Sequence, residues 1–266
     1  MRQGLQIYCQ IPFTAKERRM TKPFAALSAL ILLLGSAHAV AADAQTLYLP
    51  EAAPWSNLTG DANGNGVFDD WAAEITKRTG LVFDIKRAPS ARLQQALKDG
   101  SVDLAFGVKS TGTASFVDYP ACPVASPVII IAAKGFALTK IDDLYAAPQG
   151  VGVIRGVTYD QAFDENAQIK KSEEANVETI LKKMAAGRLQ ATIGSGVSLY
   201  YQAKTNGLRD VLADRLVVGK IDACLRTPTG KSNTPVVQAM VKALDAMKAD
   251  GTAAAIVTKY VGDGWQ

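Results

Sequence analysis

The stretch "LVFDIKRAPSARLQQALKDGSVDLAFG", residues 81–107, decides the fold class. Its first eight residues predict a strand, and Ser90 then caps a helical pattern that ends at Gly100. The following "VDLAFG" predicts a buried strand. A strand, a helix and a strand in this order pair in parallel through a crossover helix, so we expect an α/β fold.

The same alternation extends on both sides of this stretch. Residues 67–80 predict a helix, with Asp69 and Asp70 favouring its positive amino-terminal end and Gly80 ending it. A second α/β unit follows the apolar run "PVIIIAAKG" (127–135). Its expected elements are a strand at 151–156, a helix at 175–188, a strand at 189–194 and two helices within 234–262.

The amino-terminal segment is typical of a secretory leader. After Lys22, an apolar run reaches Leu34, and small residues suited to signal peptidase follow up to Ala41. We therefore expect residues 1–41 to form a leader and the mature protein to be periplasmic. Two interpretations of residues 1–19 stay open, a long polar start of the leader or an extension upstream of the true start.

Removing this leader changes the chemistry available. The 29 basic and 25 acidic residues of the whole chain become 24 of each, so the basic balance predicts neither nucleic-acid nor membrane binding. The only histidine, His38, would also leave. Serine–histidine–aspartate catalysis and typical zinc sites are then excluded, and we expect no metal and no cofactor.

Cys122 and Cys224 remain in the predicted mature chain. An exported protein permits a disulfide, but two buried thiols are the alternative, and the sequence leaves the choice open.

The segment "GDANGNGVFDDW" (60–71) resembles a calcium-binding EF-hand loop at its start. Asp61, Asn63, Asn65 and Gly66 have the correct spacing, but the twelfth position, which needs a bidentate carboxylate, is Ala72. We therefore interpret the segment as a turn that leads into a helix.

Four segments together resemble the family 3 extracellular solute-binding proteins, the periplasmic receptors of polar amino-acid ABC importers. They are "LKDGSVDLAFG" (97–107), "VGVIRGVTYD" (151–160), "KKMAAGRLQATIG" (182–194) and "MKADGTAAAIVTKYVG" (247–262). The resemblance implies a type II fold, in which two α/β lobes close on a ligand. Lobe one would comprise residues 43–127 and 227–266, and lobe two residues 128–226. The strands containing "VIIIAAK" and "DACLRT" would be the two hinges.

The anchors that this family uses for an α-amino acid are missing. The place of its carboxylate-binding arginine falls on Ala114 or Ser115, and that of its ammonium-binding aspartate falls on Ser195. The place of its aromatic cover falls on Ala52, with Trp55 three residues later. This departure puts an ordinary zwitterionic ligand in doubt.

Other polar residues match the family's two binding loops. Lys109, Ser110 and Thr111 follow the lobe-one strand, and Arg155 and Thr158 belong to the lobe-two loop, where backbone N–H groups precede a helix. The predicted ligand-binding set is completed by two further residues, Trp55 and Ser195. Non-binding alternatives are that Lys109 is solvated, that Trp55 packs in the core, and that Arg155 pairs with Asp160 or Asp164.

These residues favour capture of a small polar ligand, anionic or amino-acid-like, for an ABC permease, by a monomer that is not an enzyme. One alternative is an accessory or sensory protein for a periplasmic oxidoreductase or signalling system. The other is a dehydratase on the same fold, which would need an acid or base placed in the cleft.

Overall fold

The computed structural model describes residues 44–56 and 66–266. The predicted leader and the first ligands of the EF-hand-like segment lie outside these residues. Among the described residues, none of the helices combines the length and the apolarity needed to cross a bilayer.

One mixed sheet of eight strands organises the described chain, in the order β2-β1-β3-β8-β4-β7-β5-β6. β1, β2 and β3 pair in parallel, as do β5, β6 and β7, whereas β4 and β8 pair antiparallel to each other and to their outer neighbours. The strands are β1 (Gln45–Pro50), β2 (Phe83–Ala88), β3 (Ala105–Val108), β4 (Val117–Ala133), β5 (Val151–Ile154), β6 (Lys171–Glu174), β7 (Ala191–Ser195) and β8 (Leu212–Pro228).

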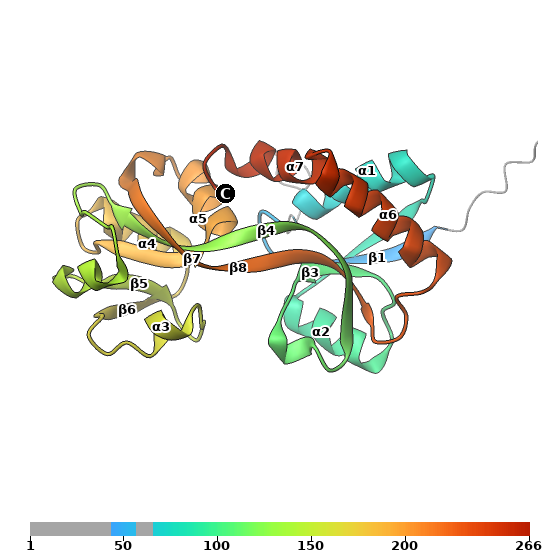
Figure 1. The fold of residues 1–266 in the computed structure, drawn as a ribbon, viewed down its shortest axis with the longest axis horizontal. Coiled ribbons are helices and arrows are strands. Elements are labelled where there is room, and N and C mark those ends of the chain that lie inside the picture. The colour runs from blue at the N-terminus through green and yellow to red at the C-terminus, as the bar shows by residue number, and fades with distance from the viewer. Residues whose placement is uncertain (1–43, 57–65) are drawn as a thin grey trace, which may run out of the picture. The chain divides into compact units, whose positions relative to one another are not determined.

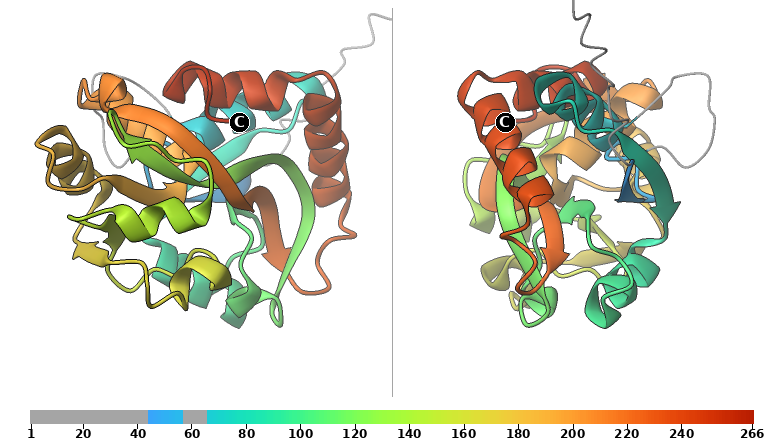
Figure 2. Two further views of the ribbon diagram at one scale, coloured as in Figure 1. Left: turned by 60° about the vertical axis from the view of Figure 1, so that its left-hand side comes forward. Right: turned by 90° about the vertical axis from the view of Figure 1, so that its right-hand side faces the viewer.

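The two long strands join two halves of this sheet. We call β2, β1 and β3 the first half-sheet, and β7, β5 and β6 the second half-sheet. β4 and β8 pair along almost their whole length and run side by side between the halves (Figures 1 and 2). This is the α/β arrangement predicted from the strand and helix order. The two segments expected as hinge strands, "VIIIAAK" and "DACLRT", lie in β4 and β8.

Helices pack on the faces of both half-sheets. The α-helices are α1 (Val67–Thr79), α2 (Ser90–Asp99), α3 (Gln161–Asp164), α4 (Val177–Ala185), α5 (Gly196–Thr205), α6 (Pro235–Ala249) and α7 (Thr252–Val261). Three 3₁₀ turns are η1 (Thr111–Thr113), η2 (Ile141–Ala146) and η3 (Arg209–Val211). α1, α6 and α7 share one core with the first half-sheet, and residues of α2 pack in a separate cluster with Ala105 and Val117.

Local sequence explains where the helices begin and end. α4 begins after Asn176, whose side chain accepts a hydrogen bond from the Thr179 N–H at 2.9 Å. α1 ends at Gly80, which has φ +76° and so occupies the left-handed region that glycine tolerates best. α2 begins at Ser90 itself, one residue earlier than the predicted cap implied.

The start of α1 shows what the EF-hand-like acidic residues do. The Asp69 carboxylate accepts a hydrogen bond from the Gly66 N–H at 2.9 Å and pairs with Arg87. Asp70 accepts from Lys259 at 2.7 Å, which ties α1 to α7. These two carboxylates serve the helix start and the packing of the first half, as the turn interpretation expected.

Candidate functional site

A cavity of about 610 Å³ lies where the two half-sheets meet the long strands. Its volume falls within the range of small-molecule sites. Both half-sheets, β4, β8 and the start of α5 contribute to it. The lining residues are Val108, Lys109, Ser110, Val128, Ile154, Val157, Thr158, Tyr159, Val177, Ile193, Gly194, Ser195, Ser198, Leu199, Gly219, Lys220 and Ile221.

Four predicted ligand-binding residues come together on this lining: Lys109, Ser110, Thr158 and Ser195. The first two follow β3, whereas Thr158 lies in the loop after β5 and Ser195 ends β7 of the second half-sheet. The chain separates them by up to 86 positions, so only the fold makes them neighbours of one space. The backbone of Thr111 is in η1, directly after Ser110.

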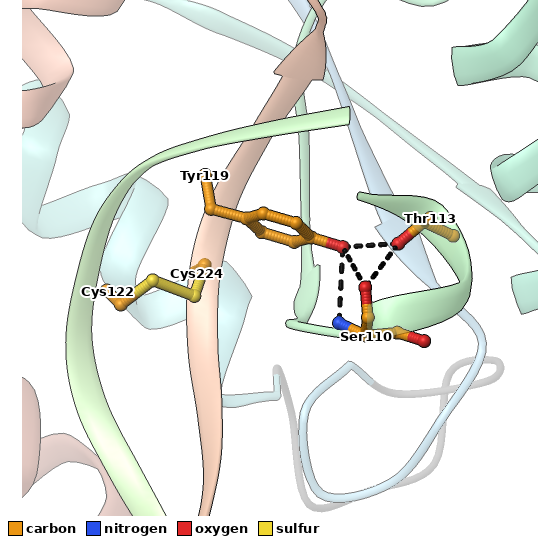
Figure 3. The surroundings of a disulfide bond; sticks show 5 residues. All are labelled: Ser110, Thr113, Tyr119, Cys122 and Cys224. Carbon is orange, nitrogen blue, oxygen red and sulfur yellow. Dashed lines mark hydrogen bonds between the residues drawn. A yellow bond between two sulfur atoms is a disulfide. The ribbon is translucent and has the colours of Figure 1, made fainter. Parts of the chain in front are cut away.

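Lys109 and Ser110 form the first wall of the cavity, together with Val108. The Lys109 N–H donates to the Asp222 carbonyl of β8 at 2.8 Å, which fixes the end of β3. Tyr119 of β4 holds the next residue, because its hydroxyl accepts from the Ser110 N–H at 3.2 Å and also bonds the Thr113 hydroxyl. Figure 3 shows this hydroxyl pointing toward Ser110 and Thr113. The first wall is therefore held from two neighbouring strands.

A disulfide joins the same two strands close to this wall. Cys122 of β4 and Cys224 of β8 are bonded across 102 positions of sequence (Figure 3). The alternative of two free thiols does not describe this structure.

The second wall consists of the loop after β5 and the start of α5. Ser195 is the residue before α5, and its hydroxyl lies 2.8 Å from that of Ser126, a fully buried residue of β4. The Ser126 hydroxyl also accepts from the Val197 N–H at 3.3 Å, so one side chain orients both Ser195 and the helix start. The positive end of α5 therefore lies at Ser195 and Ser198 on the lining.

Tyr159 supports the loop of this wall from inside. Its hydroxyl accepts a hydrogen bond from the Ile154 N–H at 2.8 Å. Burial raises the pKa of Tyr159, so the phenol stays protonated at neutral pH. It offers the cavity a neutral polar group.

Arg155 has another partner in this structure. Its Nε lies 3.4 Å from a carboxylate oxygen of Glu173 on β6, and both side chains are largely exposed. It is not among the lining residues. The partner differs from Asp160 and Asp164, the alternatives considered from the sequence. Arg155 directly follows β5, and the parallel pairing of β5 with β6 brings it close to Glu173.

The protein's own carboxylates bind the N–H groups at the start of α3. Asp160 caps α3 by accepting from the Phe163 N–H at 3.2 Å. Asp164 accepts from the N–H groups of Tyr159 and Asp160 at 2.7 and 3.1 Å. These N–H groups follow the predicted binding loop of Arg155, Gly156 and Thr158, so the bonds leave that prediction untested.

Trp55 belongs to the core of the first half. It is 6% exposed, and its ring stacks on Phe68 with centroids 5.2 Å apart. Gly66 lies against it, because a Cβ there would come within 2.8 Å of the Trp55 carbonyl oxygen. The packing alternative therefore describes Trp55 in this structure.

Sequence reasoning missed several residues of the site. Lys220 lies two residues before the predicted hinge segment "DACLRT", and no local pattern showed that it lines the cavity. Val108 and Val157 are exposed apolar residues that line it from opposite walls. The exposure of these two apolar side chains marks them as candidate binding residues, but exposure can be seen only in the structure.

The electrostatic character of the cavity is cationic. Lys109 and Lys220 are the charged residues of its described lining, and no Asp or Glu is among the described lining residues. Four aliphatic hydroxyl groups complete the polar part, from Ser110, Thr158, Ser195 and Ser198. In the described part of the chain, no cluster of three or more His, Cys, Asp or Glu side chains could hold a metal ion. The arrangement suits hydrogen bonding to a small anion.

A second hollow, of about 570 Å³, lies between the long strands and the carboxyl terminus. Prolines, Val217, Ala254 and Trp265 line much of it, with Lys220 as its charged residue. It lacks the several convergent polar groups that orient a small ligand, so we assign the site to the first cavity.

Comparisons with known proteins agree with this architecture. The family model for bacterial extracellular solute-binding proteins, family 3, matches residues 46–263. No curated protein sequence matches the chain.

Solved structures of low sequence identity share the fold. The second substrate-binding domain of a putative amino acid ABC transporter from Streptococcus pneumoniae is 18% identical (TM-score 0.65), with 82% of this chain and 100% of that chain covered. The L-cystine solute receptor of Neisseria gonorrhoeae is 16% identical (TM-score 0.66), covering 82% and 92%. The Bordetella pertussis BvgS periplasmic VFT2 domain is 16% identical (TM-score 0.61), covering 82% and 93%. With the family model spanning both half-sheets, the chain belongs to the family 3 bacterial extracellular solute-binding proteins.

Proposed function

We propose that this protein captures a small anionic solute, a carboxylate in particular, in the cavity between the half-sheets. The observation that carries the proposal is the charge of the lining, which includes Lys109 and Lys220 and, among the residues that the structure describes, no carboxylate side chain. A carboxylate placed there would gain charge-assisted hydrogen bonds from lysine and from the hydroxyl groups.

The same charge pattern disfavours a zwitterionic amino acid. An α-ammonium group moved into this cavity would lose its water without meeting an acidic side chain on the lining. Ser195, at the position where the family resemblance implies an aspartate, offers only a hydroxyl. An acid without an essential amine is therefore the better ligand class.

Capture would proceed by closure of two lobes, residues 43–127 with 227–266 and residues 128–226, about β4 and β8. We further propose export by the leader at residues 1–41, a periplasmic location, a monomeric state and delivery to an ABC permease. The name of the Streptococcus pneumoniae domain, a substrate-binding domain of a putative amino acid ABC transporter, supports the delivery role. The binding role is preferred over catalysis because the family and these structural neighbours are named for binding.

A sensory role is the second candidate. It is favoured by the structural likeness to the BvgS VFT2 domain and to a histidine kinase sensor domain with similarity to periplasmic binding proteins. Genes for a permease and an ATPase beside this one would favour import, whereas a kinase gene would favour sensing.

The test is a thermal-shift and calorimetric screen of the mature protein. The probes are acetate, pyruvate, malonate, succinate and L-glutamate, with L-lysine as the cationic comparison. We expect a carboxylate to raise the melting temperature, because a ligand that binds only the folded state stabilises it by about 2.7 kcal/mol at 100 times its Kd.

Matched lysine variants then locate the binding. Lys220→Met should weaken binding of that carboxylate about tenfold, equivalent to about 1.4 kcal/mol. Lys242→Met removes an exposed lysine of α6 and should leave the affinity unchanged. Preference for L-lysine, or equal binding by both variants, would contradict the proposal.

A further inference from the structure

Arg226 of β8 is a buried charge without a hydrogen-bond or ion-pair partner among the residues that the structure describes. Its side chain is 4% exposed, and it makes no ion pair with any of the described residues. Its Nε atom is fully buried and has no hydrogen-bond partner in the described part of the chain. A buried guanidinium in this state loses hydration without gaining a counter-charge, which is costly for the folded protein.

The side chain lies against the strand that forms the first wall. Arg226 pairs in register with Ala105, and it extends past Gly107, the next residue on the same face of β3. A Cβ on Gly107 would lie 2.6 Å from the Arg226 Nη1 and 2.9 Å from its Cδ. The glycine therefore makes room for the guanidinium directly before Val108, where the cavity lining begins.

Tyr119 connects this guanidinium with the wall. Burial lowers the pKa of Arg226, and the electrostatic effect of Tyr119 acts in the opposite direction. Its hydroxyl contacts the N–H and the carbonyl of Ser110 at 3.2 and 3.3 Å, as Figure 3 shows. Its ring also lies 5.8 Å from the Lys109 ammonium. Tyr119 thus contacts Ser110 and Lys109 of the first wall and acts electrostatically on Arg226, which is buried and is not itself a lining residue.

We propose that Arg226 is the anion anchor of the first wall and receives a carboxylate group of the bound solute beside Ser110. This inference rests on the proposed function and names its main binding residue. A guanidinium suits the task, because its forked N–H groups bind a carboxylate through two parallel hydrogen bonds. The ligand's charge would supply the counter-ion that the described residues do not. Proteins accept such a loss of stability where a binding site needs it.

The test compares stability and binding in the same variants of the mature protein. Arg226→Met keeps the approximate length and removes the charge. We expect its ligand-free melting temperature to equal or exceed that of the wild type, while its affinity for succinate, malonate and pyruvate falls more than tenfold. Arg226→Lys keeps the charge but loses the fork, and should recover part of the affinity. Arg92→Met removes an exposed arginine of α2 and should change neither quantity.

Gly107→Ala tests the position of the guanidinium without removing it. The added Cβ must displace Arg226, so we expect the carboxylate affinity to fall although the charge is retained.

The outcomes separate this inference from the proposed function. If Lys220→Met weakens carboxylate binding and Arg226→Met does not, the cationic cavity stands and the Arg226 anchor is overturned. If Arg226→Met lowers the melting temperature and leaves the affinity intact, Arg226 has a partner within the protein and the inference is also overturned. If the wild type binds none of the carboxylates, both proposals fail together.

Discussion

The two walls of the cavity differ in how firmly the protein holds them. The first wall is fixed by Tyr119, by the Lys109–Asp222 backbone bond and by a disulfide nearby. The loop of the second wall, from Arg155 to Thr158, is exposed, as is the first wall itself. The supports of this loop are the Arg155–Glu174 and Val157–Ile154 backbone bonds, a surface ion pair and the Tyr159 hydroxyl. The first wall differs in having the disulfide nearby and a tyrosine hydroxyl with two partners.

This difference assigns the walls different parts in capture. A wall that is cross-linked and bonded from two strands loses less conformational entropy when a ligand binds than a loop with weaker side-chain supports. We therefore expect the solute to bind the first wall first and the second wall to close over it. The following variants test this order, from the largest expected effect to the smallest.

Removing the disulfide should have the largest effect, because it loosens the two strands that hold the first wall. Cross-linking a loop of 102 positions stabilises the folded state by up to about 4–5 kcal/mol in the chain-entropy model. For a protein of this size, Cys122→Ser with Cys224→Ser should lower the melting temperature by roughly 10–20 °C. Differential scanning calorimetry measures this, with reductant as a second route for the wild type. An unchanged melting temperature would show that packing alone holds the strands.

Tyr119→Phe should weaken the first wall more than Tyr159→Phe weakens the second. The Tyr119 hydroxyl bonds both Ser110 and Thr113, whereas the Tyr159 hydroxyl accepts from Ile154. Each lost hydrogen bond lowers the free energy of unfolding by about 1 kcal/mol. We therefore expect this free energy to fall by about 2 kcal/mol in Tyr119→Phe and by about 1 kcal/mol in Tyr159→Phe. Urea unfolding and carboxylate titration of both variants measure it. The reverse order would contradict the comparison of the walls.

Glu174 gives the second half-sheet a pH-dependent support. The Lys183 ammonium, 2.5 Å away, holds the pKa of this buried carboxyl below its ordinary value, with help from Ser172. A lowered pKa in the folded state means that the stabilisation is present at neutral pH and is lost as the pH falls through the folded-state pKa.

The check is the melting temperature of the wild type and Glu174→Gln between about pH 7 and pH 3. The difference in melting temperature in favour of the wild type should shrink as the solution becomes more acidic. Glu178→Gln disrupts an exposed pair with Lys182, so its melting temperature should stay close to that of the wild type over the same pH range. A wild-type advantage that is constant with pH would show that Glu174 is not stabilised as a carboxylate.

Arg155→Ala should have the smallest effect. Arg155 and Glu173 are 73% and 61% exposed, and such surface pairs contribute at most about 1 kcal/mol. We expect carboxylate affinity to change by less than about twofold in calorimetry. A tenfold loss would show that Arg155 leaves Glu173 for the ligand, and would restore the role that the sequence proposed for it.

Much of the fold was accessible from the sequence because local signals mark it. Asn176 and Gly80 mark helix ends, and apolar runs mark the two long strands. β6 carried no such signal, because Lys171–Glu174 is a polar stretch at the edge of the sheet. α5 was also missed, since its start is fixed by Ser126 from a distant strand and not by a local cap.

The sequence by itself determined the α/β class, the family and the absence of the usual amino-acid anchors, because these depend on residue identity and order along the chain. Tertiary structure decided which polar residues share the cavity. It placed Trp55 in the core, paired Arg155 with Glu173, brought Lys220 to the lining and buried Arg226 beside Gly107. The reason is physical: the partners of a charged side chain depend on strand register and packing between distant segments, which no local pattern encodes.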